Sequence, residues 1–331
     1  MGEVSVSAVV PLYNGAEFIA EALDSIMRQS EPPAEIIVVN DGSSDDGPAI
    51  VEKIAASQGA LPLVLLHKEN GGQSSARNLG VNRCKGTHVA FLDQDDIWYE
   101  DHIEVLSSEL KTSDKRKQPA LIYGNLDQID RAGRMVNRRC LDDLPGPHPK
   151  TSRSQYLRDD MFIVPSASLV SVAAFLAAGG FDERLSGYED DDLFLRMFTA
   201  GYESVYVDKS VTRWRIHSAS SSYSPRMAAS RMVYYKKLTE DFQDDPDRAQ
   251  FWLRDLVAPR FFRQTCLEFI LATRQRNYDA SLCAWQNVIE VADGMPKRVV
   301  RHIRGASSII RSLIELKRFR LARFIFRRAM R

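Results

Sequence analysis

The sequence predicts an α/β fold, in which helices flank a mostly parallel sheet and a helical extension follows at the C-terminal end. Three observations support this prediction. Strand-like and helix-like segments alternate along the first hundred residues, as expected for a parallel sheet with helical crossovers. The strand-like segments are continuously apolar, as in Ile36-Ile37-Val38-Val39, which favours burial on both faces of the sheet. From about Pro225 onward the pattern is helical only.

The first hundred residues contain four strand–helix pairs. Residues 4–12 form an apolar, β-branched run that predicts a strand, and residues 16–28 predict a helix because their apolar side chains recur at helical spacing. The same two patterns then repeat. They predict strands at 35–39, 63–67 and 88–92, and helices at 45–56, 74–84 and 101–110.

The pattern is less regular after residue 120. Apolar runs predict strands at 120–127, 135–139, 165–170 and 204–208, and helical spacing predicts a helix that ends at Gly179-Gly180 and another at 190–200. Residues 142–154 are polar and contain several prolines, so we expect a loop there.

The uncharged residues 161–181 have the length of a membrane span. Pro165, three serines and the Gly179-Gly180 pair within them favour a buried strand followed by a short helix instead. The four cysteines form no C-x-x-C pair, so we expect reduced thiols and a cytoplasmic protein.

The chain of 331 residues is long enough for a large domain of residues 1–222 and a helical region of residues 223–331. The formal net charge is zero, but from Met295 to Arg331 twelve Lys and Arg face a single acid, Glu315. Apolar residues alternate with these bases, which predicts a basic amphipathic helix. Such a helix either contacts an anionic membrane, on the cytoplasmic face of the inner membrane, or packs on the protein with its basic side in water. No nucleic-acid-binding motif is present, so we expect no nucleic-acid partner.

Polar clusters follow three of the predicted strands, where an open parallel sheet binds its ligands. They are Pro11-Leu12-Tyr13-Asn14, Asn40-Asp41-Gly42-Ser43-Ser44-Asp45 and Asp93-Gln94-Asp95-Asp96. In the last cluster three carboxylates repel one another, and a divalent cation that also binds phosphate would relieve the repulsion. The alternative is a capped helix N-terminus. None of these loops has the glycine pattern of a dinucleotide fold or the lysine of a P-loop.

Two further features have both a structural and a functional interpretation. The run Glu189-Asp190-Asp191-Asp192 opens a predicted helix, where acids either stabilise the helix dipole or supply a general base for a hydroxyl nucleophile. A lone histidine, His217, is either structural or, beside a carboxylate-bound cation, a metal ligand.

Together these segments resemble glycosyltransferase family 2, in particular its non-processive members with a GT-A, Rossmann-like fold. Seven matching segments follow the order of the family between residues 4 and 222; besides the three clusters they are Asn70-Gly71-Gly72-Gln73-Ser74-Ser75-Ala76-Arg77-Asn78, Gly179-Gly180-Phe181-Asp182-Glu183, Glu189-Asp190 with Asp192-Leu193 and Arg196, and Arg215-Ile216-His217. The resemblance implies that residues 1–222 are a catalytic domain that binds a nucleotide sugar. It implies metal-dependent, inverting transfer from a nucleotide diphosphate donor to a hydroxyl of a saccharide or lipid-linked saccharide, in cell-surface polysaccharide biosynthesis. The expected donor is a UDP-sugar, with dTDP and GDP as alternatives.

The resemblance also implies roles for individual residues. The donor-binding set would be Pro11, Tyr13, Asn14, Asp41, Arg77 and Asp93. Within it, Pro11, Tyr13 and Asp41 would form the pocket for the base, Arg77 would lie near the base or the diphosphate, and Asp93 would contact ribose or sugar. Asp95 and His217 would bind Mn²⁺ or Mg²⁺. Asp190 would be the catalytic base, with Asp191 as its rival.

One departure from the family and two rival functions bear on this interpretation. Processive relatives carry a Gln-x-x-Arg-Trp motif, whereas this chain has Ser210 three residues before Arg213-Trp214, so the resemblance implies transfer of a single sugar. A sugar nucleotidyltransferase would need a glycine-rich basic loop after the first strand, and none is present. A non-catalytic module that binds a nucleotide sugar or glycan would be favoured by loss of Asp95 or Asp190, and both are retained.

Overall fold

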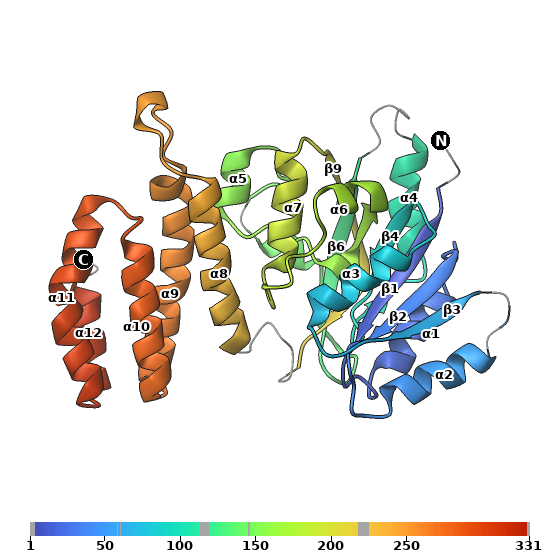
Figure 1. The fold of residues 1–331 in the computed structure, drawn as a ribbon, viewed down its shortest axis with the longest axis horizontal. Helices are drawn as coiled ribbons and strands as arrows, with labels where there is room; N and C mark the ends of the chain where they lie inside the picture. Colours follow the sequence, from blue (N-terminus) through green and yellow to red (C-terminus); the bar gives the residue numbers. More distant parts are fainter. Residues whose placement is uncertain are drawn as a thin grey trace. The chain divides into compact units, whose positions relative to one another are not determined.

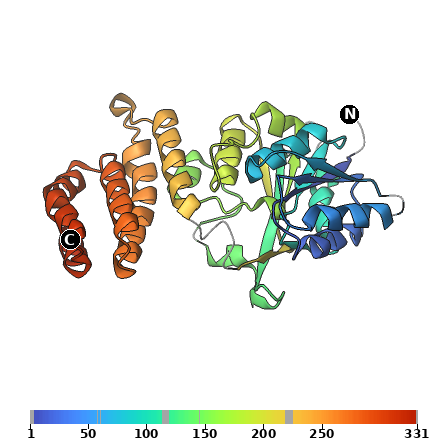
Figure 2. The ribbon, with the colours of Figure 1, turned by 60° about the horizontal axis from the view of Figure 1, so that its bottom comes forward.

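The computed structural model describes residues 4–57, 59, 61–112, 119–144, 146–217 and 225–329, and Figures 1 and 2 show its ribbon from two directions. The chain divides into two compact units. Unit 1 contains Met1–Thr151 and Met161–Ser230, and unit 2 contains Ser152–Asp160 and Arg231–Arg331. The domain boundary expected at residues 222/223 falls outside the described residues.

Unit 1 is built on a nine-stranded sheet with the order β3-β2-β1-β4-β8-β6-β9-β5, and β7 pairs with β6. The strands are β1 (Val6–Leu12), β2 (Glu35–Asn40), β3 (Leu63–His67), β4 (His88–Phe91), β5 (Ile97–Trp98), β6 (Leu121–Ile129), β7 (Met135–Asn137), β8 (Ser168–Ser171) and β9 (Ser204–Arg215). In the described sheet, β1, β2, β3, β4, β6 and β9 run in one direction and β5, β7 and β8 in the other. The prediction of a mostly parallel sheet is therefore confirmed.

Helices cover the sheet of unit 1, as Figure 1 shows. They are α1 (Ile19–Met27), α2 (Gly47–Ser57), α3 (Gln73–Arg83), α4 (His102–Thr112), α6 (Val172–Ala177) and α7 (Glu189–Thr199). Every residue of β1 and β2 is buried, which agrees with their continuously apolar sequences.

The uncharged residues 161–181 form β8 and α6, preceded by a 3₁₀ turn at Pro165–Ala167. A strand and a short helix were predicted here, and the alternative of a membrane-spanning helix is not what the structure contains. Among the described helices, none has both the length and the apolar character that crossing a bilayer requires.

Three elements differ from the prediction. The two-residue strand β5 is too short to leave a periodic signal. Strand β9 was expected to end at Asp208 but continues to Arg215. Its pairing with β6 shifts register near Gly124, which lets the strand continue past its polar residues. One of these, Ser210, donates its hydroxyl to Asp127 at 2.6 Å. The predicted loop of residues 142–154 contains the end of a 3₁₀ helix (Cys140–Asp143) and the start of α5 (Arg153–Arg158), which Ser152 and Gln155 begin with a capping box.

Unit 2 is helical, as predicted. Its longer helices are most of α8 (Pro225–Asp241), α9 (Ala258–Arg274), α10 (Tyr278–Ala292), α11 (Lys297–Glu315) and α12 (Phe319–Ala329). It also contains α5, a 3₁₀ turn (Pro246–Arg248) and a π-helical turn (Leu253–Val257). Aromatic side chains form part of its core, where Phe269 lies 5.3 Å from Trp285 and 5.0 Å from Phe326 between ring centroids.

Candidate active site

The three polar clusters that follow β1, β2 and β4 lie at one edge of the sheet. Strand β1 pairs in parallel with both neighbours, with Leu12 opposite Asn40 and Val9 opposite Phe91. Two backbone hydrogen bonds continue the pairing past the strand ends, since Asp41 N–H donates to the Leu12 carbonyl at 2.8 Å and Leu92 N–H to the Val9 carbonyl at 3.0 Å. The clusters therefore converge, as expected for parallel neighbours.

Hydrogen bonds tie the loop after β1 to the other two. The amide of Gln94 accepts from Tyr13 N–H at 2.8 Å and donates to the Tyr13 carbonyl at 3.1 Å. Asn14 has φ of 48° and joins the second loop, since its Oδ1 accepts from Ser44 N–H at 2.8 Å. The Tyr13 side chain is 47% exposed while its backbone is held. The loop thus presents one aromatic ring to solvent from a fixed position, while Pro11 is buried.

Asp41 is a buried acceptor at the start of α3. Its carboxylate accepts from Lys68 Nζ at 2.7 Å, Gly71 N–H at 2.9 Å and Gly72 N–H at 2.7 Å. Gly72 directly precedes α3 and has φ of 89°, a conformation that favours glycine. Asp41 therefore fixes the glycine-containing turn that opens α3.

The three carboxylates after β4 point to different partners. Asp93 forms an ion pair with Arg77 Nη2, and Asp95 Oδ2 lies 2.9 Å from His217 Nε2. Asp96 is buried and accepts from Arg215 N–H at 2.9 Å. Burial, followed by the charges of Asp95 and Asp93, raises the pKa of Asp96 well above its ordinary value. Asp96 thus holds the end of β9, and Asp95 meets His217 just beyond it.

Arg77 connects this loop to α7. The guanidinium pairs with Asp93 through Nη2 and with Glu189 through Nη1 at 2.9 Å, and the side chain is only 2% exposed. Burial opposes the charge, but Asp93 and Glu189 together raise the pKa of Arg77 above its ordinary value, so it stays a cation. The predicted contact of Arg77 with the base or the diphosphate stays a prediction; in this structure Arg77 positions two carboxylates.

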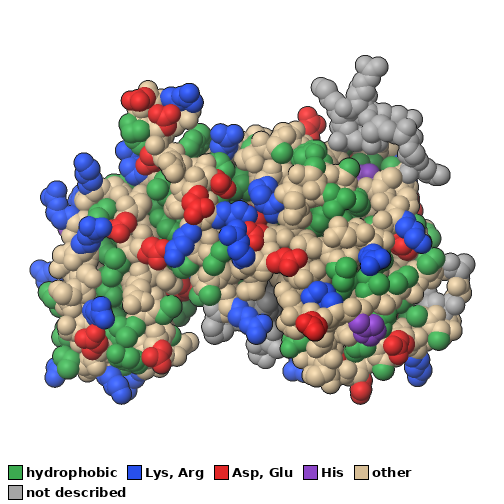
Figure 3. All heavy atoms as spheres, viewed as in Figure 1, with side chains coloured by type: hydrophobic (Ala, Val, Ile, Leu, Met, Phe, Trp, Pro, Cys, Tyr) green, Lys and Arg blue, Asp and Glu red, His purple; other side chains and the backbone are tan. Residues whose placement is uncertain are grey.

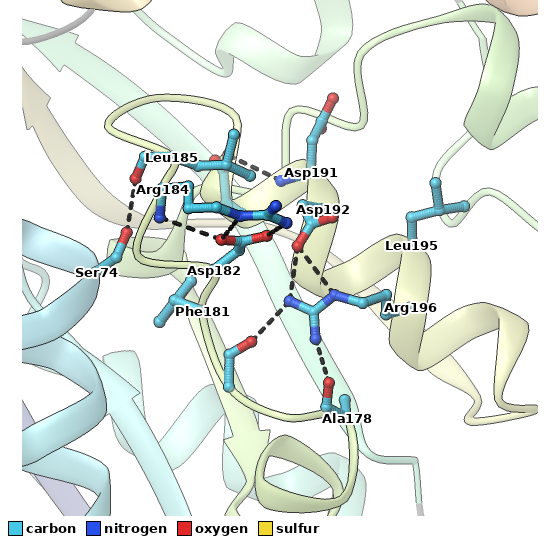
Figure 4. Close-up of polar contacts among 12 residues, drawn as sticks. Ser74, Ala178, Phe181, Asp182, Arg184, Leu185, Asp191, Asp192, Leu195 and Arg196 are labelled. Carbon is cyan, nitrogen blue, oxygen red and sulfur yellow. Dashed lines mark hydrogen bonds and ion pairs between the residues drawn. The ribbon is translucent and has the colours of Figure 1, made fainter. Parts of the chain in front are cut away.

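The acidic residues that open α7 are held by separate partners. Glu189 binds Arg77 and Gln73, and the buried Asp191 accepts from Met161 N–H at 2.8 Å. Asp192 accepts from Arg196 Nη2 at 2.7 Å. Figure 4 shows that the Arg196 guanidinium also reaches the carbonyl of Ala178. Glu189, Asp191 and Asp192 therefore stabilise the surrounding structure.

Asp190 differs from these neighbours. Its carboxylate accepts the backbone N–H of Asp191 at 2.8 Å, and no Lys, Arg or His of the described chain forms an ion pair with it. Its pKa is raised well above the ordinary value, first by burial and then by the charges of Glu189 and Asp191. Its residue remains partly exposed. A partly exposed residue whose carboxyl pKa is raised suits proton transfer, so the arrangement favours Asp190 over Asp191 as the base.

Asp95 and His217 supply one carboxylate and one imidazole donor side by side. Within the described residues, no group of three or more His, Cys, Asp or Glu side chains is arranged to hold a metal ion. Two protein donors of these types nevertheless fit a divalent cation whose remaining ligands are substrate oxygens and water. The donor set is therefore compatible with Mn²⁺ or Mg²⁺ bound together with a diphosphate.

Sequence reasoning missed several residues that build this site. Gln94 lay inside a recognised motif, but its bond to Tyr13 spans distant positions in the chain. Glu189 belonged to the acidic run, and only the fold shows that it pairs with Arg77. Lys68 carries no local signal. Arg215, which donates through Nε to the Asp95 carbonyl at 2.7 Å, was part of a matched segment without an assigned role.

Comparison with known proteins identifies the family. The family model described as "Glycosyl transferase family 2" matches residues 7–171. An uncharacterized glycosyltransferase of Rickettsia prowazekii is 33% identical over 239 residues, which cover 72% of this chain and 71% of that protein. The chain belongs to glycosyltransferase family 2. A longer relative, an uncharacterized glycosyltransferase of Rickettsia bellii, is 30% identical over 298 residues, covering 89% of this chain but 40% of that protein. The chain thus spans less than half the length of this family member.

Solved structures with a similar fold support the fold of this chain. The crystal structure of Staphylococcus aureus TarS 1–349 matches 97% of this chain and 90% of its own, with 19% sequence identity and a TM-score of 0.62. The same TarS fragment in complex with UDP-GlcNAc matches with a TM-score of 0.63 at 18% identity. The likeness confirms the predicted GT-A fold with its C-terminal helices.

Proposed function

We propose that this family 2 protein is an inverting glycosyltransferase that moves a sugar from a UDP-sugar to a hydroxyl of a saccharide acceptor. One observation carries the proposal. Arg77 is ion-paired both to Asp93, in the loop of the expected donor site, and to Glu189, the neighbour of Asp190. The residues assigned to donor binding and to proton transfer therefore belong to one connected cluster, as a single displacement reaction requires.

The loops after β1 and β2 support nucleotide binding. The exposed Tyr13 ring offers a face on which a base can stack. Asp41 lies next to this loop, since its backbone N–H pairs with the Leu12 carbonyl. Its carboxylate already accepts three hydrogen bonds, which leaves it one acceptor position of about four for the base. TarS, which shares the fold, has been crystallised with UDP and with UDP-GlcNAc, and UDP is the carrier that we propose here.

Asp95 and His217 are the residues that would hold Mn²⁺ or Mg²⁺. A bound cation would neutralise the charge that develops on the departing diphosphate. Arg215 prepares this pair, because its contacts to the Asp95 carbonyl and to Asp96 fix the β9 end two residues before His217.

Asp190 is the proposed general base. Its carboxylate would take the proton from the acceptor hydroxyl, whose oxygen forms a bond to the anomeric carbon opposite the diphosphate. The bond between that carbon and the diphosphate oxygen breaks, so the configuration inverts. Because its pKa is raised, the ionised carboxylate of Asp190 is a stronger base than that of an ordinary aspartate.

The acceptor that we propose is a saccharide, free or lipid-linked, in cell-surface polysaccharide biosynthesis at the cytoplasmic face of the membrane. The uneven charge supports this choice, since the C-terminal segment is strongly basic although the chain is neutral.

A nucleotide-sugar screen tests the proposed function. UDP-, dTDP- and GDP-sugars are each added with Mn²⁺, with Mg²⁺ or with EDTA, and thermal stabilisation and slow donor hydrolysis are measured. We expect a UDP-sugar to stabilise the protein only with a cation, and Asp95→Ala to abolish both effects. Absence of stabilisation and hydrolysis with every donor would refute the proposal. Release of pyrophosphate from a nucleoside triphosphate and a sugar phosphate would favour a nucleotidyltransferase, and binding without turnover would favour a non-catalytic module.

A further inference from the structure

Five arginines gather in unit 2 where α9 ends and α12 begins. Arg274 is the last residue of α9 and Arg276 follows it, while Arg320, Arg323 and Arg327 lie three and four residues apart on one face of α12. None of the five forms an ion pair with an Asp or Glu among the residues that the structure describes. Nη1 of Arg323 is buried and has no hydrogen-bond partner among the described residues.

The other four arginines are close enough to Arg323 for their charges to act on it. Burial and the positive charges of the other four lower the pKa of Arg323. A group of cations that repel one another and have no carboxylate partner is stabilised by a bound anion. The cluster therefore has the charge and the free donors of a phosphate-binding surface.

Large apolar side chains are exposed on the same two helices. On α9, Leu267 and Leu271 share a face with Arg274 and are 60% and 52% exposed. On α12, Phe324 is 60% exposed, and Leu321 is also exposed. Figure 3 shows hydrophobic side chains between Lys and Arg on the visible face of the C-terminal helices. Exposed apolar groups next to a charged cluster are typical of an interaction surface.

The opposite face of α12 is packed. Phe319, Ala322 and Phe326 are buried, and the Phe326 ring contacts Phe269 of α9 and Trp285 of α10. Core packing therefore anchors α12 and leaves Arg320, Phe324 and Arg327 exposed. The two interpretations of the basic tail, packing on the protein and contact with an anionic surface, are compatible in one helix.

We propose that this surface docks the protein on an anionic lipid membrane. Its residues are Leu267, Leu271, Arg274, Arg276, Arg320, Leu321, Arg323, Phe324 and Arg327. The arginines would bind lipid phosphates, and the apolar side chains would enter the boundary between head groups and acyl chains. A soluble phosphate would use the arginines alone, whereas a membrane also accounts for the exposed leucines and Phe324.

Vesicle co-sedimentation of the full chain, without nucleotide sugar, tests the proposal. We expect binding to vesicles of phosphatidylglycerol and phosphatidylethanolamine that weakens with salt, and little binding to phosphatidylcholine. Each basic residue near an anionic membrane contributes roughly a fivefold gain in partitioning. Arg274→Glu/Arg276→Glu/Arg320→Glu should therefore reduce binding at least tenfold. Leu271→Ser/Phe324→Ser should weaken it while keeping the salt dependence.

The matched control is Arg298→Glu/Arg301→Glu. These exposed arginines belong to the same basic segment but lie in the first turns of α11, about 20 Å along the helix from its junction with α12. We expect this variant to keep binding within threefold of the parent. Equal losses in both charge-reversal variants, displacement from vesicles by inorganic phosphate at low millimolar concentration, or no binding by the parent would each overturn the proposal. Nucleotide-sugar binding is measured in a separate experiment, so a protein that binds no nucleotide sugar would still test the membrane proposal.

Discussion

Four consecutive acidic residues at the start of α7 have different environments, and the environment determines which of them is free to react. Glu189 is neutralised by Arg77, and Asp192 is paired with Arg196. Asp191 accepts a hydrogen bond from the backbone N–H of Met161. Asp190 remains partly accessible, with an elevated pKa. Residue type alone could not separate these four positions, because their roles depend on partners that are distant in sequence.

Asp190→Asn should abolish most turnover and leave donor affinity nearly unchanged. A positioned base typically contributes about 10²- to 10⁴-fold in rate, and the amide cannot accept the proton. Steady-state turnover and nucleotide-sugar affinity, measured on the same preparation, check the prediction.

Asp191→Asn is the matched control at the neighbouring position. Its amide oxygen can still accept from Met161 N–H, so we expect turnover within about tenfold of the parent. An inactive Asp191→Asn protein beside an active Asp190→Asn protein would reverse the assignment of the base.

The raised pKa of Asp190 predicts a shifted pH dependence. The base must be ionised to accept a proton, so kcat/KM should fall as the pH decreases through the raised pKa, above the range of an ordinary aspartate. A pH–rate profile measures this acid limb. A limb at the ordinary aspartate value of about 3.9 would contradict the prediction.

The same pKa has an opposite consequence for stability. The folded state holds the proton of Asp190 more tightly than the unfolded state does, so this group favours folding at low pH and loses that contribution as pH rises through the folded pKa. Asp190→Asn removes the cost of burying the charge. We therefore expect the variant to be at least as stable as the parent at pH 8 in denaturant unfolding, although it has lost activity.

At the scale of elements, one arginine organises the loop between α6 and α7. Arg196 donates to the carbonyls of Ala178 and Gly180 while pairing with Asp192 within its own helix. Figure 4 shows this junction, together with the Ser74 hydroxyl that donates to the Leu185 carbonyl. The loop is thus bound to α7 at one end and to α3 at the other, which explains why a glycine-containing connection can position the start of α7.

Gly180→Ala should destabilise the protein more than Gly201→Ala. Both glycines have positive φ, at 70° and 88°, which costs other residues roughly 1–2 kcal/mol. A Cβ at Gly180 would lie 2.8 Å from Asn78 Oδ1, whereas a Cβ at Gly201 would meet nothing within 4 Å. The Asn78 amide cannot move freely, because it pairs with both the N–H and the carbonyl of Phe181.

We expect a loss on the order of 3 kcal/mol for Gly180→Ala in equilibrium unfolding, and about half of that for Gly201→Ala. Equal losses in the two variants would show that backbone strain alone matters and that the contact with Asn78 does not.

The elements that were predictable are those with a local pattern. Continuous apolar runs identified β1 to β4, and helical spacing identified α1 to α4 within a few residues. Strand β5 is too short for such a signal, and the far end of β9 depends on pairing with β6. The motifs contain Asp93, Asp95 and Asp190, but the burial of Arg77 between the loop after β4 and the start of α7 is a long-range contact that no spacing encodes.

At the scale of the whole molecule, the chain forms two units, and one of them takes in a short segment from the middle of the sequence. Ser152–Asp160 belongs to unit 2, although it is preceded and followed by residues of unit 1. Its attachment depends on a distant contact, since Arg260 of α9 pairs with Asp160 and also donates to the Tyr156 carbonyl. Sequence composition cannot predict that this segment belongs to unit 2, because the assignment depends on contacts with distant residues.

Binding of the nucleotide should therefore protect backbone amides from hydrogen exchange only in unit 1. All residues that we assign to donor binding belong to that unit, so UDP with Mn²⁺ should slow hydrogen exchange in the loops after β1, β2 and β4 and leave α9 to α12 unchanged. Exchange mass spectrometry measures this, with ADP as the nucleotide control. Protection spread over the C-terminal helices would contradict the assignment.

The double pairing of Arg77 also predicts that the binding of the two substrates is coupled. A ribose or sugar hydroxyl that binds Asp93 would compete with the Arg77 guanidinium for this carboxylate, and the other partner of Arg77, Glu189, is the neighbour of the proposed base. Occupancy of the first substrate is thereby thermodynamically linked to the state of the residue that activates the second. Binding of either substrate should therefore change the affinity for the other by the same factor.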